Sequence, residues 1–94
     1  MARYVSLIRF TDKGAAAIKE SSKRAQAFDR AAEAAGVRIV GQYWTIGSHD
    51  GGLIVEADSE KKALHWLTEL VSQGNVKTET LQAFDAAEFD AIVR

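Results

Sequence analysis

A histidine and an aspartate stand side by side at positions 49 and 50 of this 94-residue chain. Histidine has an ordinary pKa of about 6.5, so beside a carboxylate it can exchange protons near neutral pH. Tyr43 would complete a catalytic set of His49, Asp50 and Tyr43. The alternative is a hairpin turn in which the Asp50 side chain accepts hydrogen bonds from nearby backbone N–H groups. Tyr43 and Trp44 also suit a protein interface, where aromatic side chains with polar tips are common.

A second set of polar residues follows near the end of the chain, at Asn75, Thr78, Thr80 and Gln82. The last three alternate along a predicted strand, so they share one face of it. Polar side chains on an otherwise apolar face predict a ligand-binding cavity between the sheet and whatever covers it. The alternative is structural, because threonine suits strands and forms hydrogen bonds across them.

The residue types for a metal or phosphate site are missing or scattered. The chain has two histidines and no cysteine, and His49 and His65 have no metal-ligand spacing. The glycines form neither a dinucleotide-binding nor a P-loop pattern. We therefore predict no metal and no cofactor.

Composition limits the class of protein. Of 44 apolar residues 16 are alanine, so a single domain over residues 1–94 has few side chains to fill a core. The net charge of the chain is -1, whereas a nucleic-acid-binding domain usually carries an excess of lysine and arginine. No apolar run approaches the ~18 residues of a membrane span. We expect a soluble, cytoplasmic domain with neither nucleic-acid nor membrane partners.

Hydrophobic periodicity predicts the elements that position these residues. Strands are expected at residues 3–10, 37–46, 52–57 and 75–84. Helices are expected at residues 15–35, with a break where a serine can start a second segment, at 58–73, and after a capping box at Asp85 and Glu88. This order predicts a ferredoxin-like α+β fold, with two helices on one face of a four-stranded antiparallel sheet and a short C-terminal helix.

The first two strands carry bulky side chains on both faces. Residues 3–10 place Val5 and Leu7 on one face and Tyr4, Ile8 and Phe10 on the other, which predicts a central strand. Alternation along residues 37–46 predicts two faces. One face holds Val37, Ile39, Gly41, Tyr43 and Thr45, and the other holds Arg38, Val40, Gln42, Trp44 and Ile46.

The predicted fold leaves one face of the sheet uncovered. That face carries either Tyr4, Ile8 and Phe10 or Val5 and Leu7, whichever set points away from the helices. Such a face is usually covered by another copy, which predicts a homodimer or larger homo-oligomer. The C-terminal helix is a further candidate cover, for its own sheet or a neighbour's. Residues 1–47 carry a net charge of +4 and residues 48–94 carry -5, so opposite charges could also guide association with a partner.

Three segments resemble the GYD domain family: residues 43–57, which begin Tyr43-Trp44-Thr45-Ile46-Gly47-Ser48-His49-Asp50; residues 74–84, which begin Gly74-Asn75-Val76-Lys77-Thr78; and the opening Arg9-Phe10-Thr11-Asp12-Lys13-Gly14. The resemblance covers nearly the whole chain and implies association as a dimeric α/β barrel. The chain departs from the family pattern at His49, where a tyrosine is typical, at Ser22, where proline is frequent, and at Lys77, where arginine is common.

These observations favour a small oligomeric domain that binds a small molecule at the sheet face or the subunit interface, through Asn75, Thr78, Thr80 and Gln82. One alternative is a cofactor-less oxygenase or isomerase that uses His49, Asp50 and Tyr43. Another is a structural or protein-interaction module, which the charge asymmetry favours.

Overall fold

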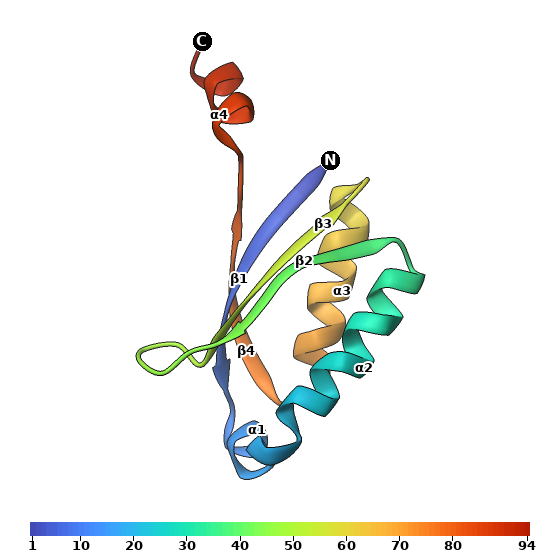
Figure 1. The fold of residues 1–94 in the computed structure, drawn as a ribbon, viewed down its shortest axis with the longest axis vertical. Coiled ribbons are helices and arrows are strands. Elements are labelled where there is room, and N and C mark those ends of the chain that lie inside the picture. Colours follow the sequence, from blue (N-terminus) through green and yellow to red (C-terminus); the bar gives the residue numbers. More distant parts are fainter.

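The computed structural model describes residues 1–94, and its four-stranded antiparallel sheet carries helices α2 and α3 on one side (Figure 1). The strands are β1 (Ala2–Phe10), β2 (Val37–Trp44), β3 (Gly51–Ala57) and β4 (Val76–Gln82). The helices are α1 (Asp12–Ala16), α2 (Ser21–Ala34), α3 (Glu60–Ser72) and α4 (Ala86–Val93), with a 3-10 turn at Ile18–Glu20. This order is the predicted ferredoxin-like α+β arrangement. None of the helices is long and apolar enough to cross a lipid bilayer.

The strands are ordered β2-β3-β1-β4, and every neighbouring pair is antiparallel. The apolar residues on both faces of β1 predicted a central strand, and β1 does lie between β3 and β4. Strands β2 and β4 form the two edges, so Tyr43, Thr78 and Thr80 all belong to edge strands.

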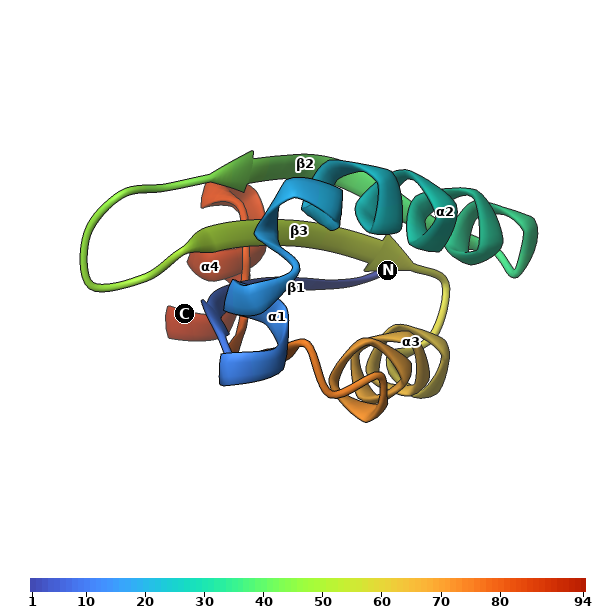
Figure 2. The ribbon, with the colours of Figure 1, turned by 90° about the horizontal axis from the view of Figure 1, so that it is seen from below.

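One face of the sheet holds the core. Helix α2 packs over β2, and α3 packs over β1, β3 and β4. Figure 2 shows α2 close to β2, with the backbone of α3 at a distance from that of α2. The rings of Phe28 on α2 and Trp66 on α3 meet edge to face, with centroids 5.7 Å apart. The buried cluster comprises Tyr4, Phe28, Ala32, Val37, Leu53, Val55, Ala57, Ala63 and Leu67. Only 13 of 94 residues are buried, so apolar surface remains outside this core.

A β-bulge in β2 overturns the alternation expected for that strand. The register with β3 shifts between Ile39 and Gly41, so one extra residue faces the partner strand. Beyond the bulge Gln42 and Trp44 turn toward α2, where Gln42 Nε2 donates to Asp29 Oδ1 and Trp44 Nε1 donates to Ser21 Oγ. Val37 and Ile39 share that side, whereas Tyr43 lies on the opposite face.

Local hydrogen bonds set the helix starts. Thr11 Oγ1 caps α1 by accepting from the Gly14 N–H, and the predicted capping box of Asp85 and Glu88 starts α4. The expected serine cap of α2 is wrong, because Glu20 occupies that position and makes no side-chain cap. Gly14 is buried against β4, where a Cβ atom would overlap the Asn75 carbonyl oxygen.

Helix α4 does not cover its own sheet. It projects beyond the end of β4 and away from the rest of the chain (Figure 1). None of its residues is buried. The face opposite α2 and α3 is therefore uncovered within the chain.

Candidate functional site

We call the uncovered side of the sheet the open face. The strand register assigns to it Arg3, Val5, Leu7 and Arg9 of β1, Arg38, Gly41 and Tyr43 of β2, Gly52, Ile54 and Glu56 of β3, and Lys77, Glu79 and Leu81 of β4. Its apolar centre consists of Val5, Leu7, Tyr43, Ile54 and Leu81. Tyr43 is 65% exposed and Leu81 is 47% exposed. Contiguous exposed apolar side chains with a charged rim are typical of a binding surface.

The loop between β2 and β3 extends this surface. Its path is held by Thr45 Oγ1, which donates to the His49 carbonyl oxygen, and by Arg9 Nε, which donates to the Ser48 carbonyl oxygen. At the loop's tip Ile46 is fully exposed. A wide, shallow groove runs beneath the loop, lined by side chains that include Val5, Leu7, Tyr43, Ile46, His49 and Ile54.

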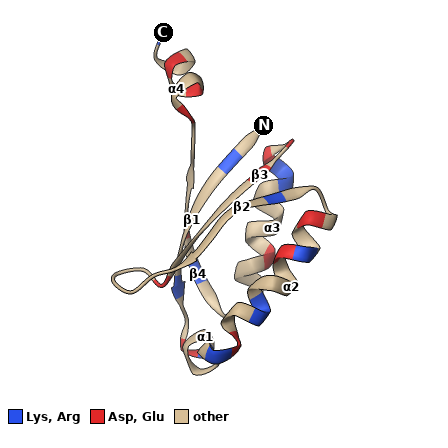
Figure 3. Cartoon of the chain, viewed as in Figure 1, with Lys and Arg blue, Asp and Glu red and all other residues tan.

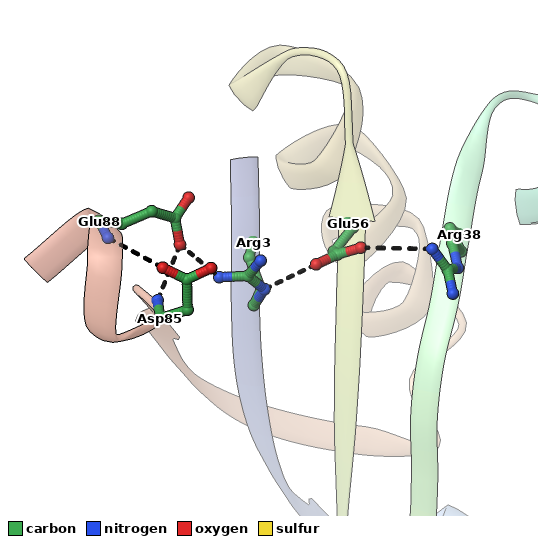
Figure 4. Close-up of polar contacts among 5 residues, drawn as sticks. All are labelled: Arg3, Arg38, Glu56, Asp85 and Glu88. Carbon is green, nitrogen blue, oxygen red and sulfur yellow. Dashed lines mark hydrogen bonds and ion pairs between the residues drawn. The ribbon is translucent and has the colours of Figure 1, made fainter. Parts of the chain in front are cut away.

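A row of charged side chains crosses the end of the open face nearest α4 (Figure 4). Glu56 of β3 lies between Arg38, at 3.8 Å, and Arg3, at 2.7 Å. Arg3 also donates through Nη1 to Glu88 Oε1 at 2.7 Å. The hydrogen bonds to Glu88 and then Glu56 raise the pKa of Arg3. The Asp85 backbone N–H and then the Arg3 side chain lower the pKa of Glu88. This row joins three strands to the start of α4.

The structure places the side chains of His49 and Asp50 apart. Asp50 Oδ2 accepts a hydrogen bond of 2.8 Å from the Phe10 N–H, and the Asp50 N–H donates to the Ile8 carbonyl oxygen. The His49 ring instead faces Ser48 Oγ, at 3.3 Å, and Glu79 Oε1, at 3.8 Å. Asp50 thus holds the β2–β3 loop against β1, and the two side chains form no acid–base dyad.

Thr78, Thr80 and Gln82 share one face of β4, as the alternation predicts, and it is the face turned toward the helices. Thr80 Oγ1 lies 3.0 Å from Oγ of the buried Ser6 on β1. Because β4 is an edge strand, Thr80 and Gln82 are exposed. Neither lines any of the three main hollows of the molecule. Thr78 contributes to a small hollow beside His49 and Glu79.

Asn75 lines a different cavity, between the sheet and the ends of α2 and α3. The apolar wall of this cavity includes Phe28 and Leu53, and its polar lining includes Arg24, Asp50 and Asn75. Its volume is about 70 Å³, which suits only a very small guest. Tyr43 also borders it, so Tyr43, Asp50 and Asn75 are the three sequence candidates gathered there.

Sequence reasoning missed most of the apolar centre as a site. Val5 and Leu7 were recognised only as one of two possible outward-facing sets, and Ile54 and Leu81 were not singled out. The available signal was Gly41, since an isolated glycine within a strand often marks a bulge. A bulge there places Tyr43 beside Val5 and Leu7 on the open face.

The sequence also matches the model of a known protein family. The family model described as "GYD domain" matches residues 4–93, nearly the whole chain. The chain belongs to the GYD domain family. The resemblance seen in residues 43–57 and 74–84 is thereby confirmed.

This GYD domain has a relative in Thermus thermophilus that is 33% identical over 92 residues, covering 97% of each chain. That relative is named "Glutamine synthetase and cystathionine beta-lyase binding protein". A crystal structure of a Thermus thermophilus protein is also similar, with a TM-score of 0.58 and 25% identity. The match covers 92% of this GYD domain and 96% of the other chain. The fold is therefore shared with a solved structure, and a relative is named for binding other proteins.

Proposed function

We propose that this GYD domain is a protein-binding module and that its open face is the binding surface. The observation that carries the proposal is the uncovered apolar centre, in which Tyr43 and Leu81 are about half exposed or more. A tyrosine and branched aliphatic side chains, surrounded by arginine and carboxylate groups, match the composition of protein interfaces. The charged row of Arg38, Glu56 and Arg3 supplies a rim that selects the orientation of a partner.

The partner class we propose is a metabolic enzyme in the cytoplasm. The relative's name, which specifies glutamine synthetase and cystathionine β-lyase, supports this class. His49 and Asp50 face different partners, Glu79 and the Phe10 N–H, so the proposal is built on the open face and not on this pair.

The proposal is tested by measuring binding to purified glutamine synthetase and cystathionine β-lyase of the source organism. Leu81→Asp on the open face is expected to weaken binding by about 10-fold or more, because a charge replaces an exposed apolar contact. The matched control is Leu64→Asp on α3, a leucine of similar exposure on the opposite side of the molecule. Equal loss in both variants, or no binding of either enzyme by the unaltered protein, would contradict the proposal.

Self-association is part of the same proposal. The small buried core and the uncovered sheet support a homo-oligomer in which another copy covers each open face. Sedimentation velocity at micromolar concentration should show a species larger than the 10.3 kDa monomer. A monomer at all accessible concentrations would remove this part of the proposal.

Small-molecule binding is a second candidate function, supported by the cavity that Asn75, Asp50 and Arg24 border. The lining is part apolar and part polar, so the cavity suits a very small guest that carries both an apolar and a polar group. Titration with propan-2-ol should shift the NMR signals of Phe28 and Leu53, whereas Ala25→Met, which fills the cavity, should abolish the shifts. Unchanged spectra of the original protein would argue against a ligand there.

A further inference from the structure

Helix α4 lacks any tertiary packing that would account for its stability. None of its eight residues is buried, and Phe89, Ile92 and Val93 are each more than half exposed. These three side chains are spaced i, i+3 and i+4, so they share one side of the helix. An isolated helix shorter than about 12 residues is marginal in water. The apolar side of α4 therefore needs a surface to pack against.

The base of α4 is held firmly although the helix itself is uncovered. The Ala83 N–H donates to the Arg3 carbonyl oxygen, and the Arg3 side chain donates to Glu88. The Asp85 and Glu88 capping box closes the first turn. These contacts direct α4 beyond the end of the sheet and away from its own open face (Figure 1). Its covering surface must come from outside the chain.

The open face has the complementary properties. Apart from Arg3, which pairs with Glu88 of its own chain, it carries three cations, Arg9, Arg38 and Lys77, and two carboxylates, Glu56 and Glu79, so its net charge is +1. We call the segment 84–94 the arm. Apart from Glu88, which pairs with Arg3, it carries two carboxylates and one arginine, so the net side-chain charge is -1. Figure 3 shows the acidic residues on α4. An acidic arm with an apolar stripe matches a basic face with an apolar centre.

We infer that the arm of one copy docks on the open face of a second copy, with Phe89, Ile92 and Val93 against the apolar centre. The inference rests on the self-association part of the proposed function, and it names the segment of the second copy that occupies the open face. The open face and the apolar side of α4 both lack a cover, and the open face and the arm carry net charges of opposite sign. Each copy therefore supplies what the other lacks, and exchange of arms covers both.

Cysteine cross-linking tests the contact directly, because the chain contains no cysteine. Ile92→Cys protein is mixed with ¹⁵N-labelled Leu81→Cys protein and oxidised, and mixed disulfides are quantified by mass spectrometry. The control pair replaces Leu81→Cys with Leu64→Cys, at a similarly exposed leucine on α3. We expect the Ile92–Leu81 disulfide to form at least about 10-fold faster, since docking raises the effective concentration. Equal rates for the two pairs would overturn the inference.

The double variant carrying both Ile92→Cys and Leu81→Cys distinguishes exchange from folding back. Exchange predicts disulfide-linked dimers whose yield rises with protein concentration. A monomeric, internally cross-linked product at all concentrations means that the arm covers its own sheet, and this result overturns the inference.

A second variant separates this inference from the proposed function. Phe89→Asp with Ile92→Asp alters only exposed residues, so the circular dichroism spectrum of the body should be retained. We expect its self-association constant to weaken by about 10-fold or more. Unchanged self-association, together with loss of enzyme binding in Leu81→Asp, refutes arm exchange and leaves the proposed function standing. Weakened self-association of this double variant, together with unchanged enzyme binding by Leu81→Asp, supports arm exchange and refutes enzyme binding by the open face.

Discussion

Arg3 on the first strand and Glu88 on the last helix are joined by a hydrogen-bonded ion pair of 2.7 Å. The pair spans nearly the whole sequence and links the charged row of the open face to the base of α4. Glu88 simultaneously accepts from the Asp85 N–H, so one carboxylate both caps the helix and ties it to β1. The Glu88 side chain is therefore one of the contacts that set the direction of the arm.

Replacement of Glu88 by glutamine should loosen the arm without unfolding the body. The neutral amide weakens the charge-assisted bond to Arg3 and the cap at Asp85. We expect lower ¹⁵N heteronuclear NOE values across residues 86–93 in monomeric protein. Asp90→Asn is the control, because Asp90 pairs only with the exposed Arg94 four residues later. Similar mobility in both variants would show that Glu88 does not anchor the arm.

Acid should have the same effect as that substitution. The Asp85 N–H, and then Arg3, lower the pKa of Glu88 below its ordinary value of 4.5. The stabilisation is therefore fully present above that value and is lost as the pH falls through the lower folded-state pKa. An NMR titration of the Glu88 carboxyl carbon should give a midpoint below 4.5 in the folded protein. In Arg3→Gln the midpoint should rise only part of the way, because the cap remains. A midpoint at or above 4.5 would contradict this prediction.

Gly14→Ala should destabilise the fold. The Cβ atom of the alanine would overlap the carbonyl oxygen of Asn75, which also accepts the Thr11 N–H, so α1 must move away from Asn75. We expect the free energy of unfolding to fall by about 1–3 kcal/mol in urea denaturation. Gly52→Ala on the open face is the control, since no atom lies within 4 Å of the added Cβ. A loss that is equal in the two variants would rule out the steric explanation.

Asp50 and His49 should respond differently to alanine substitution. Asp50→Ala removes the acceptor of the Phe10 N–H and should lower the free energy of unfolding by about 1–3 kcal/mol. His49→Ala should change it by less than about 0.5 kcal/mol, because its ring makes only long polar contacts. Thermal or urea unfolding of the two variants measures both values. A large loss in His49→Ala would show that the imidazole supports the loop.

Local patterns in the sequence were sufficient for much of the fold. Apolar residues on both faces of residues 3–10 predicted a central strand, and β1 is central. The spacing of Asp85 and Glu88 predicted a capping box, and both of its hydrogen bonds are present. These features depend on residues close together in the chain, so propensity, capping and alternation decide them.

The site depended on relationships that local patterns do not contain. Adjacent positions predicted a possible pair of His49 and Asp50, yet their partners come from β4 and β1 respectively. The bulge after Ile39 moved Tyr43 to the open face and Trp44 to the side of α2. One extra residue reverses every later side chain, because a strand alternates with a period of two.

By itself, the sequence determined the order of the elements, the central place of β1 and the helix cap at Asp85. Only the tertiary structure decided that Val5 and Leu7, rather than Tyr4 and Ile8, face away from the helices, and that α4 leaves its own sheet uncovered. The physical reason is that burial is a property of packing between distant segments. Both faces of β1 are apolar, so the positions of α2 and α3 determine which one becomes the open face.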